Sequence, residues 1–195
     1  DYALQDNGGA VACDLTTRCF QVPFTIPGLL VSPNRAITDS DPSESWWFGL
    51  SAGQLGVTTN TSIYPTQVTV EYPFDSNSSP DEAPRSMILW GMIEGEENER
   101  RFNILTRATA PSLEHKLPSP SKGSFYSRYH FAHLVSFEFN IASRLSHQTF
   151  NVLADVKTSG IHFNVFVLEI RSNWGGRRTQ VRRLRVHGKA VPVKS

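Results

Sequence analysis

The feature that most constrains this chain is a series of short apolar runs, rich in β-branched and aromatic residues and separated by turn-forming residues. In residues 67–72, Val68, Val70 and Tyr72 alternate with polar neighbours, which is typical of a strand with one buried face. Clusters of Pro, Gly, Asn and Ser lie between the runs, and only Ile141–Ala154 has even a weak helical period. The sequence therefore predicts an all-β fold, a β-sandwich. The predicted strands are 10–12, 54–58, 67–72, 87–93, 131–139, 149–152, 163–170 and a strand that begins at Thr179.

Length and composition predict a single domain over residues 1–195. A chain of 195 residues with 39% hydrophobic residues can bury a substantial core without a metal or a disulfide network. No apolar run approaches 18 residues, so we expect no membrane span within this sequence. No signal peptide opens it either, so we expect that any targeting segment lies outside residues 1–195 or does not exist.

The charges are distributed unevenly, although the formal net charge is only +1. No acidic residue follows Glu169, whereas eight basic residues do, which predicts a basic face for an acidic partner. A nucleic-acid partner is not predicted, because the net charge is far below the usual basic footprint. In addition, Arg183 and Arg185 alternate with Leu184 and Val186, as on a sheet with one solvated face.

The sequence offers no motif for catalysis. It contains no phosphate-binding Gly loop, no GxSxG and no HExxH motif. His130 and His133 would lie on opposite faces of a strand, and Asp39 to Glu44 lacks the spacing of a calcium-binding EF-hand. We therefore expect a protein that is not an enzyme and that has no cofactor.

Two features bear on the cellular compartment. Cys13 and Cys19 could form one local disulfide, could bond a partner or could both be free. Asn60-Thr61-Ser62 and Asn77-Ser78-Ser79 have the pattern of N-glycosylation acceptors in polar surroundings. Such triplets also arise by chance, so they favour a lumenal or secreted location only weakly.

The two ends of the chain carry a more specific pattern. Asp1-Tyr2-Ala3-Leu4, Gly8-Gly9, Thr17-Arg18-Cys19 and the polar loop that leads into Trp46 resemble the opening half of a SUN domain. Ser172-Asn173-Trp174-Gly175 and Arg183-Leu184-Arg185-Val186-His187-Gly188 are similar to the closing signature of that family. The resemblance spans nearly the whole chain in the correct order, and it suggests a fungal or other divergent member.

This resemblance implies both a location and a partner. SUN domains are β-sandwiches of inner nuclear membrane proteins that face the perinuclear space. They bind the C-terminal peptides of KASH proteins, usually as trimers above a coiled coil, and so form the LINC complex that couples the nucleus to the cytoskeleton. The peptide adds as a strand under an apolar lid. This chain has no heptad segment, so we expect it to be monomeric or weakly associating, with a homotrimer possible in the full-length protein.

The resemblance also implies particular site residues. Phe20–Ser32 stands at the position of the lid, and Asn34–Ser45 at that of a loop which holds a potassium or sodium ion through backbone carbonyls. The family cysteine that can bond the KASH peptide is matched by Cys19. The implied peptide contacts are Cys19, Phe24, Ile26, Leu29, Tyr72, Arg178 and Arg182. The implied cation ligands are the carbonyls of Asn34, Ile37, Asp39, Glu44 and Arg182.

The sequence departs from the family pattern at several of these positions. Ser45 and Gln180 replace the two cysteines of a family disulfide, and Tyr72, Arg178 and Arg182 replace the expected His and Tyr of the terminal pocket. An arginine can pair with a peptide carboxylate, so we expect a rebuilt pocket of altered specificity. Residues 98–128 carry no clear pattern and are predicted to form a surface insertion. The alternative function is a β-sandwich module that binds a glycan or another lumenal ligand.

Overall fold

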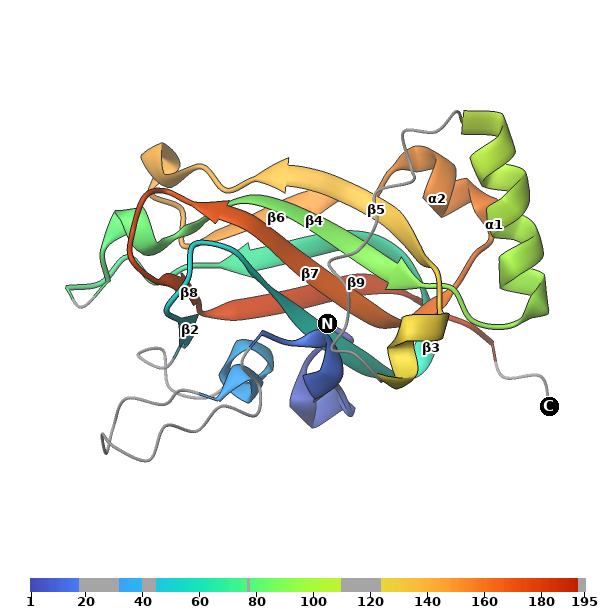
Figure 1. The fold of residues 1–195 in the computed structure, drawn as a ribbon, viewed down its shortest axis with the longest axis horizontal. Coiled ribbons are helices and arrows are strands. Elements are labelled where there is room, and N and C mark those ends of the chain that lie inside the picture. Colours follow the sequence, from blue (N-terminus) through green and yellow to red (C-terminus); the bar gives the residue numbers. More distant parts are fainter. Residues whose placement is uncertain (18–31, 40–44, 77, 110–123, 193–195) are drawn as a thin grey trace.

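One long strand, β3 (Gly53–Glu71), determines the architecture because it belongs to both layers of the sandwich (Figure 1). Its first half pairs with β1 (Ala10–Val11) and β7 (Phe163–Asn173), and its second half pairs with β6 (His147–Asn151) and β9 (Arg183–Ala190). The pairing with β7 shifts its register between Thr58 and Ile63, where the strand bends. This computed structural model describes residues 1–17, 32–39, 45–76, 78–109 and 124–192.

The larger layer continues from β7 through β4 (Pro84–Met92) to β5 (Phe131–Glu138), and every pairing is antiparallel. A separate two-stranded sheet, β2 (Trp46–Phe48) with β8 (Thr179–Val181), closes one end of the sandwich. The described residues thus form a β-sandwich, and the predicted fold class is confirmed. Short 3-10 turns connect the strands: η1 (Gln5–Asn7), η2 (Cys13–Leu15), η3 (Pro33–Ile37), η4 (Pro80–Glu82), η6 (Phe125–Arg128) and η7 (Ile141–Ser143).

The main apolar core lies between the two layers, and the alternation of β3 supplies part of it. Val68 and Val70 are fully buried there, together with Leu184 and Val186 from β9. A second apolar cluster lies around Trp90, packed with Leu15 of η2 and with Tyr126 beside it. Strand β4 is therefore buried on both faces, as the continuous apolar run 87–93 predicts.

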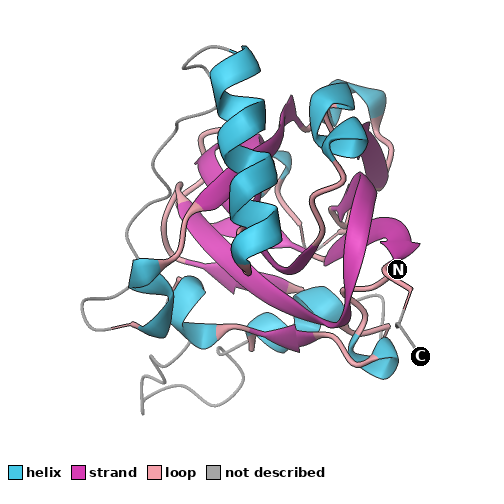
Figure 2. Ribbon diagram, turned by 90° about the vertical axis from the view of Figure 1, so that its right-hand side faces the viewer, coloured by secondary structure: helices cyan, strands magenta, loops and turns pink. Residues whose placement is uncertain are grey.

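The predicted surface insertion, 98–128, begins inside a helix instead. Helix α1 (Glu96–Thr109) stands at the end of the sandwich opposite to β2 and β8, next to α2 (Ala154–Ser159) (Figures 1 and 2). Phe102 and Leu105 pack on the core while Ile104 is 57% exposed, so the apolar stripe is narrow and easily missed in the sequence. None of the described helices is long and apolar enough to span a membrane.

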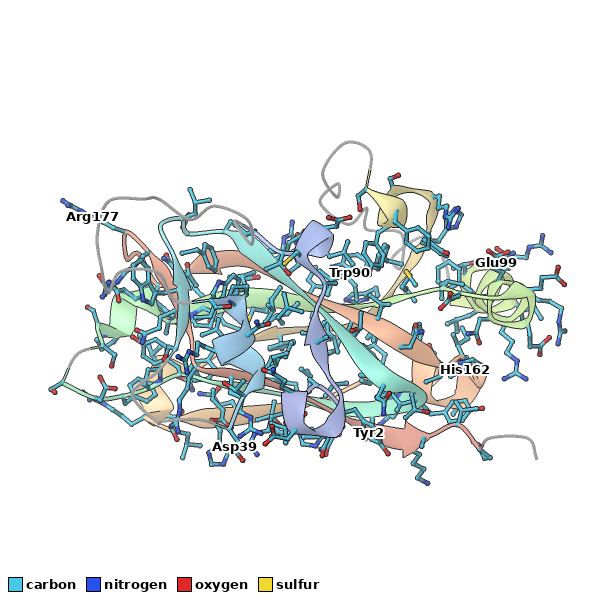
Figure 3. The ribbon with its side chains drawn as sticks, turned by 90° about the horizontal axis from the view of Figure 1, so that it is seen from below. Tyr2, Asp39, Trp90, Glu99, His162 and Arg177 are labelled. Atoms are coloured by element: carbon cyan, nitrogen blue, oxygen red, sulfur yellow. The ribbon has the colours of Figure 1, made fainter. Side chains whose placement is uncertain are left out.

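Polar contacts fasten α1 to the segment between α2 and β7. The buried amide of Asn98 donates to the carbonyls of Glu94 at 3.0 Å and His162 at 2.9 Å. Arg101 donates to the carbonyl of Gly160, which has the positive φ of 72° that glycine tolerates. Figure 3 shows His162 beside the helix that carries Glu99. The insertion is thus anchored at its start by residues that the strand pattern does not reveal.

Candidate functional site

The turn between β7 and β8 is organised by the side chain of Asn173. Its Nδ2 donates to the carbonyls of Gly176 at 2.8 Å and Arg178 at 2.9 Å, and its Oδ1 accepts from the backbone N–H of Gly175 at 3.0 Å. Gly175 has φ of 113°, which favours glycine. These contacts give a structural reason for the Asn-Trp-Gly motif, because they fix the direction in which β8 leaves the turn.

Trp174 fastens the same turn to the neighbouring strands. Its indole N–H donates to the carbonyl of Phe139 at 3.1 Å, and the guanidinium of Arg85 lies 4.5 Å from the centre of its ring. The ring also packs against the main core. Trp174 therefore has a structural role in this arrangement.

Strand β8 presents alternating side chains to opposite sides. Thr179 and Val181 are fully buried. Arg178, Gln180 and Arg182 therefore share the outward side of the strand, and Gln180 is paired across the ladder with Trp47. We call the surface formed by Trp47, Arg178, Gln180 and Arg182 the arginine face. It lies at the end of the sandwich from which Arg177 projects, opposite to Glu99 (Figure 3).

The two arginines of this face have different electrostatic environments. Nε of Arg178 donates to Glu82 Oε1 at 2.7 Å, and its guanidinium lies 5.2 Å from the centre of the Trp47 ring. The side chain of Arg182 is half-buried and forms no ion pair within the described part of the chain, although its backbone N–H donates to the carbonyl of Glu71 at 2.9 Å. The charge of Arg178 is thus largely compensated by Glu82, whereas the charge of Arg182 has no counter-ion among the described residues.

Glu82, on η4, has spare hydrogen-bonding capacity next to Arg178. Its side chain is 13% exposed, and its second oxygen, Oε2, is buried without a hydrogen-bond partner. A buried carboxylate oxygen that lacks a partner is costly unless something donates to it. A buried acceptor without a hydrogen-bond partner therefore lies beneath the edge of the arginine face, and the sequence motifs do not indicate it.

Tyr72, predicted to contact the peptide, is buried in the core. Its side chain has no exposed surface, and its hydroxyl donates to the carbonyl of Ser79 at 2.5 Å. Burial raises the pKa of Tyr72 to about 12, with the carboxylates of Glu82 and Asp81 contributing. Tyr72 shares the inward phase of Val68 and Val70, so it supports the loop before Glu82 and does not itself face a ligand.

The other predicted peptide contacts lie outside the described residues: Cys19, Phe24, Ile26 and Leu29. The same holds for most of the predicted lid, 20–32. The structure thus brings Tyr72, Arg178 and Arg182 to one end of the sandwich, two of them at the surface. Their relation to the lid segment stays a prediction.

A buried arginine that the sequence reasoning did not select lies next to this site. The side chain of Arg183 is 6% exposed and forms ion pairs with Asp39 and, at 3.2 Å, with Asp1. Tyr2 donates its backbone N–H to the carbonyl of Val186 at 2.9 Å. The opening and closing motifs, nearly the whole chain apart in sequence, are therefore interlocked. The joint appearance of these two motifs is the only sequence signal for this contact.

The predicted cation loop is described at its two ends. Asn34 and Ile37 belong to η3. The carboxylate of Asp39 pairs with Arg183, so the predicted cation ligand of Asp39 is its backbone carbonyl. Glu44 lies outside the described residues. At the far end, the hydroxyl of Ser45 is buried without a hydrogen-bond partner, so it could serve as a further oxygen ligand. In the described ranges, no group of three His, Cys, Asp or Glu side chains is placed to hold a metal.

One of the open alternatives for the cysteines is decided. Cys13 is disulfide-bonded, which excludes the pair of free thiols. The only other cysteine of the sequence, Cys19, lies outside the described residues. A disulfide at Cys13 is compatible with an oxidising compartment.

No protein family and no curated protein sequence matches the chain. Solved structures do match it. One is the family 32 carbohydrate-binding module of Streptococcus pneumoniae EndoD, with a TM-score of 0.55 and 9% identity over 93% of this chain and 97% of the module. Another is a Clostridium perfringens module of the same family in complex with GalNAc-β-1,3-galactose, with a TM-score of 0.51 and 10% identity over 91% and 92% of the two chains.

A third match is allantoicase from Saccharomyces cerevisiae, with a TM-score of 0.54 and 13% identity, where 98% of this chain covers 48% of the enzyme. At such low identity, these likenesses establish the fold alone. The chain is therefore a β-sandwich of the type found in carbohydrate-binding modules of family 32, a fold of the discoidin or galactose-binding kind.

Proposed function

We propose that the chain is a SUN-type adaptor, not an enzyme, that binds the C-terminal peptide of a KASH-type protein. The observation that carries this proposal is the interlocking of the two motifs behind the resemblance, through Asp1 with Arg183 and Tyr2 with Val186. If these motifs reflected only a general β-sandwich pattern, their residues would not have to contact one another. The contact between the opening and closing motifs gives both of them one structural role.

Within this proposal, the peptide carboxylate is recognised on the arginine face. Arg182 is the principal partner, because Arg178 already pairs with Glu82. A guanidinium and a carboxylate form charge-assisted hydrogen bonds that can be bidentate.

Calorimetry with three matched arginine variants tests this assignment. Arg182→Ala should weaken the binding of a synthetic KASH-type peptide with a free C-terminus about tenfold or more, because one charge-assisted contact is lost. Arg178→Ala should have a smaller effect, and the exposed Arg177→Ala serves as the control. Equal affinities of the Arg182 and Arg177 variants would refute the carboxylate role.

The proposed location is the nuclear envelope, with the domain facing the perinuclear space. Attachment to the inner nuclear membrane would come from segments outside this sequence. For the isolated chain we propose a monomer or a weakly associating species, with the homotrimer reserved for the full-length protein. Light scattering at micromolar concentration distinguishes these states, and a stable trimer of the chain would contradict the proposal.

We further propose a structural potassium or sodium ion in the loop 34–45, held by the carbonyls of Asn34, Ile37, Asp39, Glu44 and Arg182. The buried and unpartnered hydroxyl of Ser45 at the end of this loop supports an oxygen-rich site. The N–H of Arg182 is taken by Glu71, and the residue lies between β8 and β9, outside the register of both ladders. Stability that is the same in potassium, sodium and choline salts of equal ionic strength would contradict this ion.

Carbohydrate binding is the second candidate, and the solved structures favour it over the peptide. One of the matched modules is in complex with GalNAc-β-1,3-galactose. In this chain, Phe125 is 55% exposed and forms an aromatic cluster with Tyr129, with Arg128 lying 4.2 Å from the ring centre of Phe125. Exposed aromatic rings are suited to stack on sugars. Calorimetry with that disaccharide and a Phe125→Ala variant would test this candidate.

A further inference from the structure

We infer that Asn60 is an N-glycosylation site, modified by an N-linked oligosaccharide while the arginine face stays uncovered. The acceptor triplet Asn60-Thr61-Ser62 lies within β3 at its bend, where the register with β7 shifts between Thr58 and Ile63. This inference rests on the lumenal location proposed above, because the transferase acts in that compartment. The other triplet, at Asn77, has its acceptor outside the described residues.

The local structure leaves the acceptor side chain accessible. Asn60 is exposed, whereas Thr59 before it is buried and donates from Oγ1 to the carbonyl of Thr61 at 2.7 Å. Gly8, with φ of 84°, lies beside Asn60, and a Cβ there would stand 2.7 Å from Asn60 Cβ. Gly8 therefore packs directly against the Asn60 side chain, and a larger residue there would collide with it. The Asn60 side chain stays exposed on its other side, which is where an attached sugar would lie.

The chemistry requires only the amide, the hydroxyl two residues on and a sugar donor of the secretory lumen. Nδ2 of Asn60 forms a bond to the anomeric carbon of a lipid-pyrophosphate-linked oligosaccharide. The bond from that carbon to the pyrophosphate breaks, and the lipid pyrophosphate leaves as the amide loses one proton. Ser62 supplies the hydroxyl that the acceptor pattern needs.

Two further observations connect this site with the rest of the molecule. Cys13 is disulfide-bonded, as expected for a domain that matures in an oxidising lumen, where glycosylation also occurs. In addition, Asn60 lies at the end of the sandwich that carries α1. Ile63, just after it, pairs with Phe163, and the neighbouring His162 accepts a hydrogen bond from Asn98 of α1. The glycan would thus project from the end opposite to the arginine face, where it cannot cover a bound peptide.

Secretion of the full chain from yeast, followed by mass spectrometry before and after enzymatic deglycosylation, tests the inference. Asn60 should carry a glycan in the wild type and in Thr61→Ala, which keeps the acceptor pattern. Asn60→Gln and Ser62→Ala should each remove the glycan at this position, and Asn77→Gln should not. Because Asn60→Gln and Ser62→Ala both remove the acceptor pattern, the test remains valid if one of the two variants fails to fold.

An unmodified Asn60 in the secreted wild-type chain would overturn the inference, whether or not Asn77 is modified. So would a Ser62→Ala variant that keeps the Asn60 glycan. Peptide calorimetry on the same preparations separates this result from the proposed function. An unmodified chain that still binds the peptide would overturn the glycosylation site and leave the peptide role standing.

Discussion

Arg183, on the last strand, donates to the carboxylate of Asp1 at 3.2 Å, and this buried ion pair ties the first residue described to the closing motif. The Arg183 side chain is 6% exposed and that of Asp1 11% exposed. Asp39 adds a second carboxylate from the polar loop. One guanidinium therefore holds the opening segment, the loop after η3 and β9 together.

Replacing Arg183 by Met should destabilise the fold strongly. Met keeps most of the side-chain volume but leaves the buried Asp1 carboxylate uncompensated, which typically costs about 3–5 kcal/mol. Urea denaturation should show this loss as a lower midpoint with a similar slope. The matched control is Arg100→Met, whose exposed pair with Glu97 is screened by solvent, so this variant should leave the midpoint almost unchanged. If Arg183→Met lowers the unfolding free energy no more than Arg100→Met does, the buried ion pair does not hold these segments together.

Replacing Asn98 by Ala should loosen the docking of α1 on the sandwich. The variant removes the buried donor of the His162 carbonyl, which is itself half-buried, and we expect a loss of about 1–3 kcal/mol in the unfolding free energy. Asn103→Ala, at an exposed position of the same helix, should change the unfolding free energy by less than about 0.5 kcal/mol. Hydrogen exchange should report faster opening of α1 in the Asn98 variant alone. Equal exchange in both variants would contradict the anchoring role.

Tyr72 should make the stability of the protein fall at high pH. Its folded pKa of about 12 lies above the ordinary value of 10, so the unfolded chain releases the proton first. The contribution of Tyr72 is fully present below pH 10 and is lost as the pH rises from 10 towards 12. The thermal midpoint of Tyr72→Phe should therefore fall less over this range than that of the wild type. Parallel pH profiles would argue against a buried, neutral phenol.

Replacing Asn173 by Ala should disturb the turn before β8 and thereby the arginine face. The substitution removes the donor to the carbonyls of Gly176 and Arg178, and we expect a loss of about 1–3 kcal/mol in the unfolding free energy. Peptide affinity should fall as well, because Arg178 and Arg182 are no longer aligned. Ser172→Ala, next to the turn, is the control. A variant of Asn173 that keeps full peptide affinity would show that the turn does not position the site.

The strands could be predicted from the sequence because their signal is local. Alternation at Val68 and Val70 correctly indicated the strand and its apolar face, and the continuous apolar run around Trp90 correctly indicated burial on both faces. The expectation that 67–72 has only one buried face was wrong, because Thr69 and Glu71 are 4% and 6% exposed. Tyr72 shares the phase of Val68 and Val70, so the same alternation already favoured a core position. Its assignment to the peptide pocket came from the resemblance to SUN domains, which was given more weight than the alternation.

The remaining features depend on contacts between distant segments. Helix α1 buries only a narrow stripe and draws part of its anchoring from Asn98, whose partner His162 is 64 residues away. Arg183 lies on what local alternation marks as the solvated side of β9, and it is buried because Asp1 and the opening segment cover it. Neither relation has a periodic signature that a single sequence could reveal.

The central claim, recognition of a free peptide C-terminus by the arginine face, is tested most directly by one calorimetric comparison. The chain is titrated with a KASH-type peptide that ends in a carboxylate, with the same peptide amidated, and with GalNAc-β-1,3-galactose. We predict binding of the free acid, a loss of about tenfold or more on amidation, and no binding of the disaccharide. Equal binding of the two peptides, or binding of the disaccharide alone, would contradict the claim.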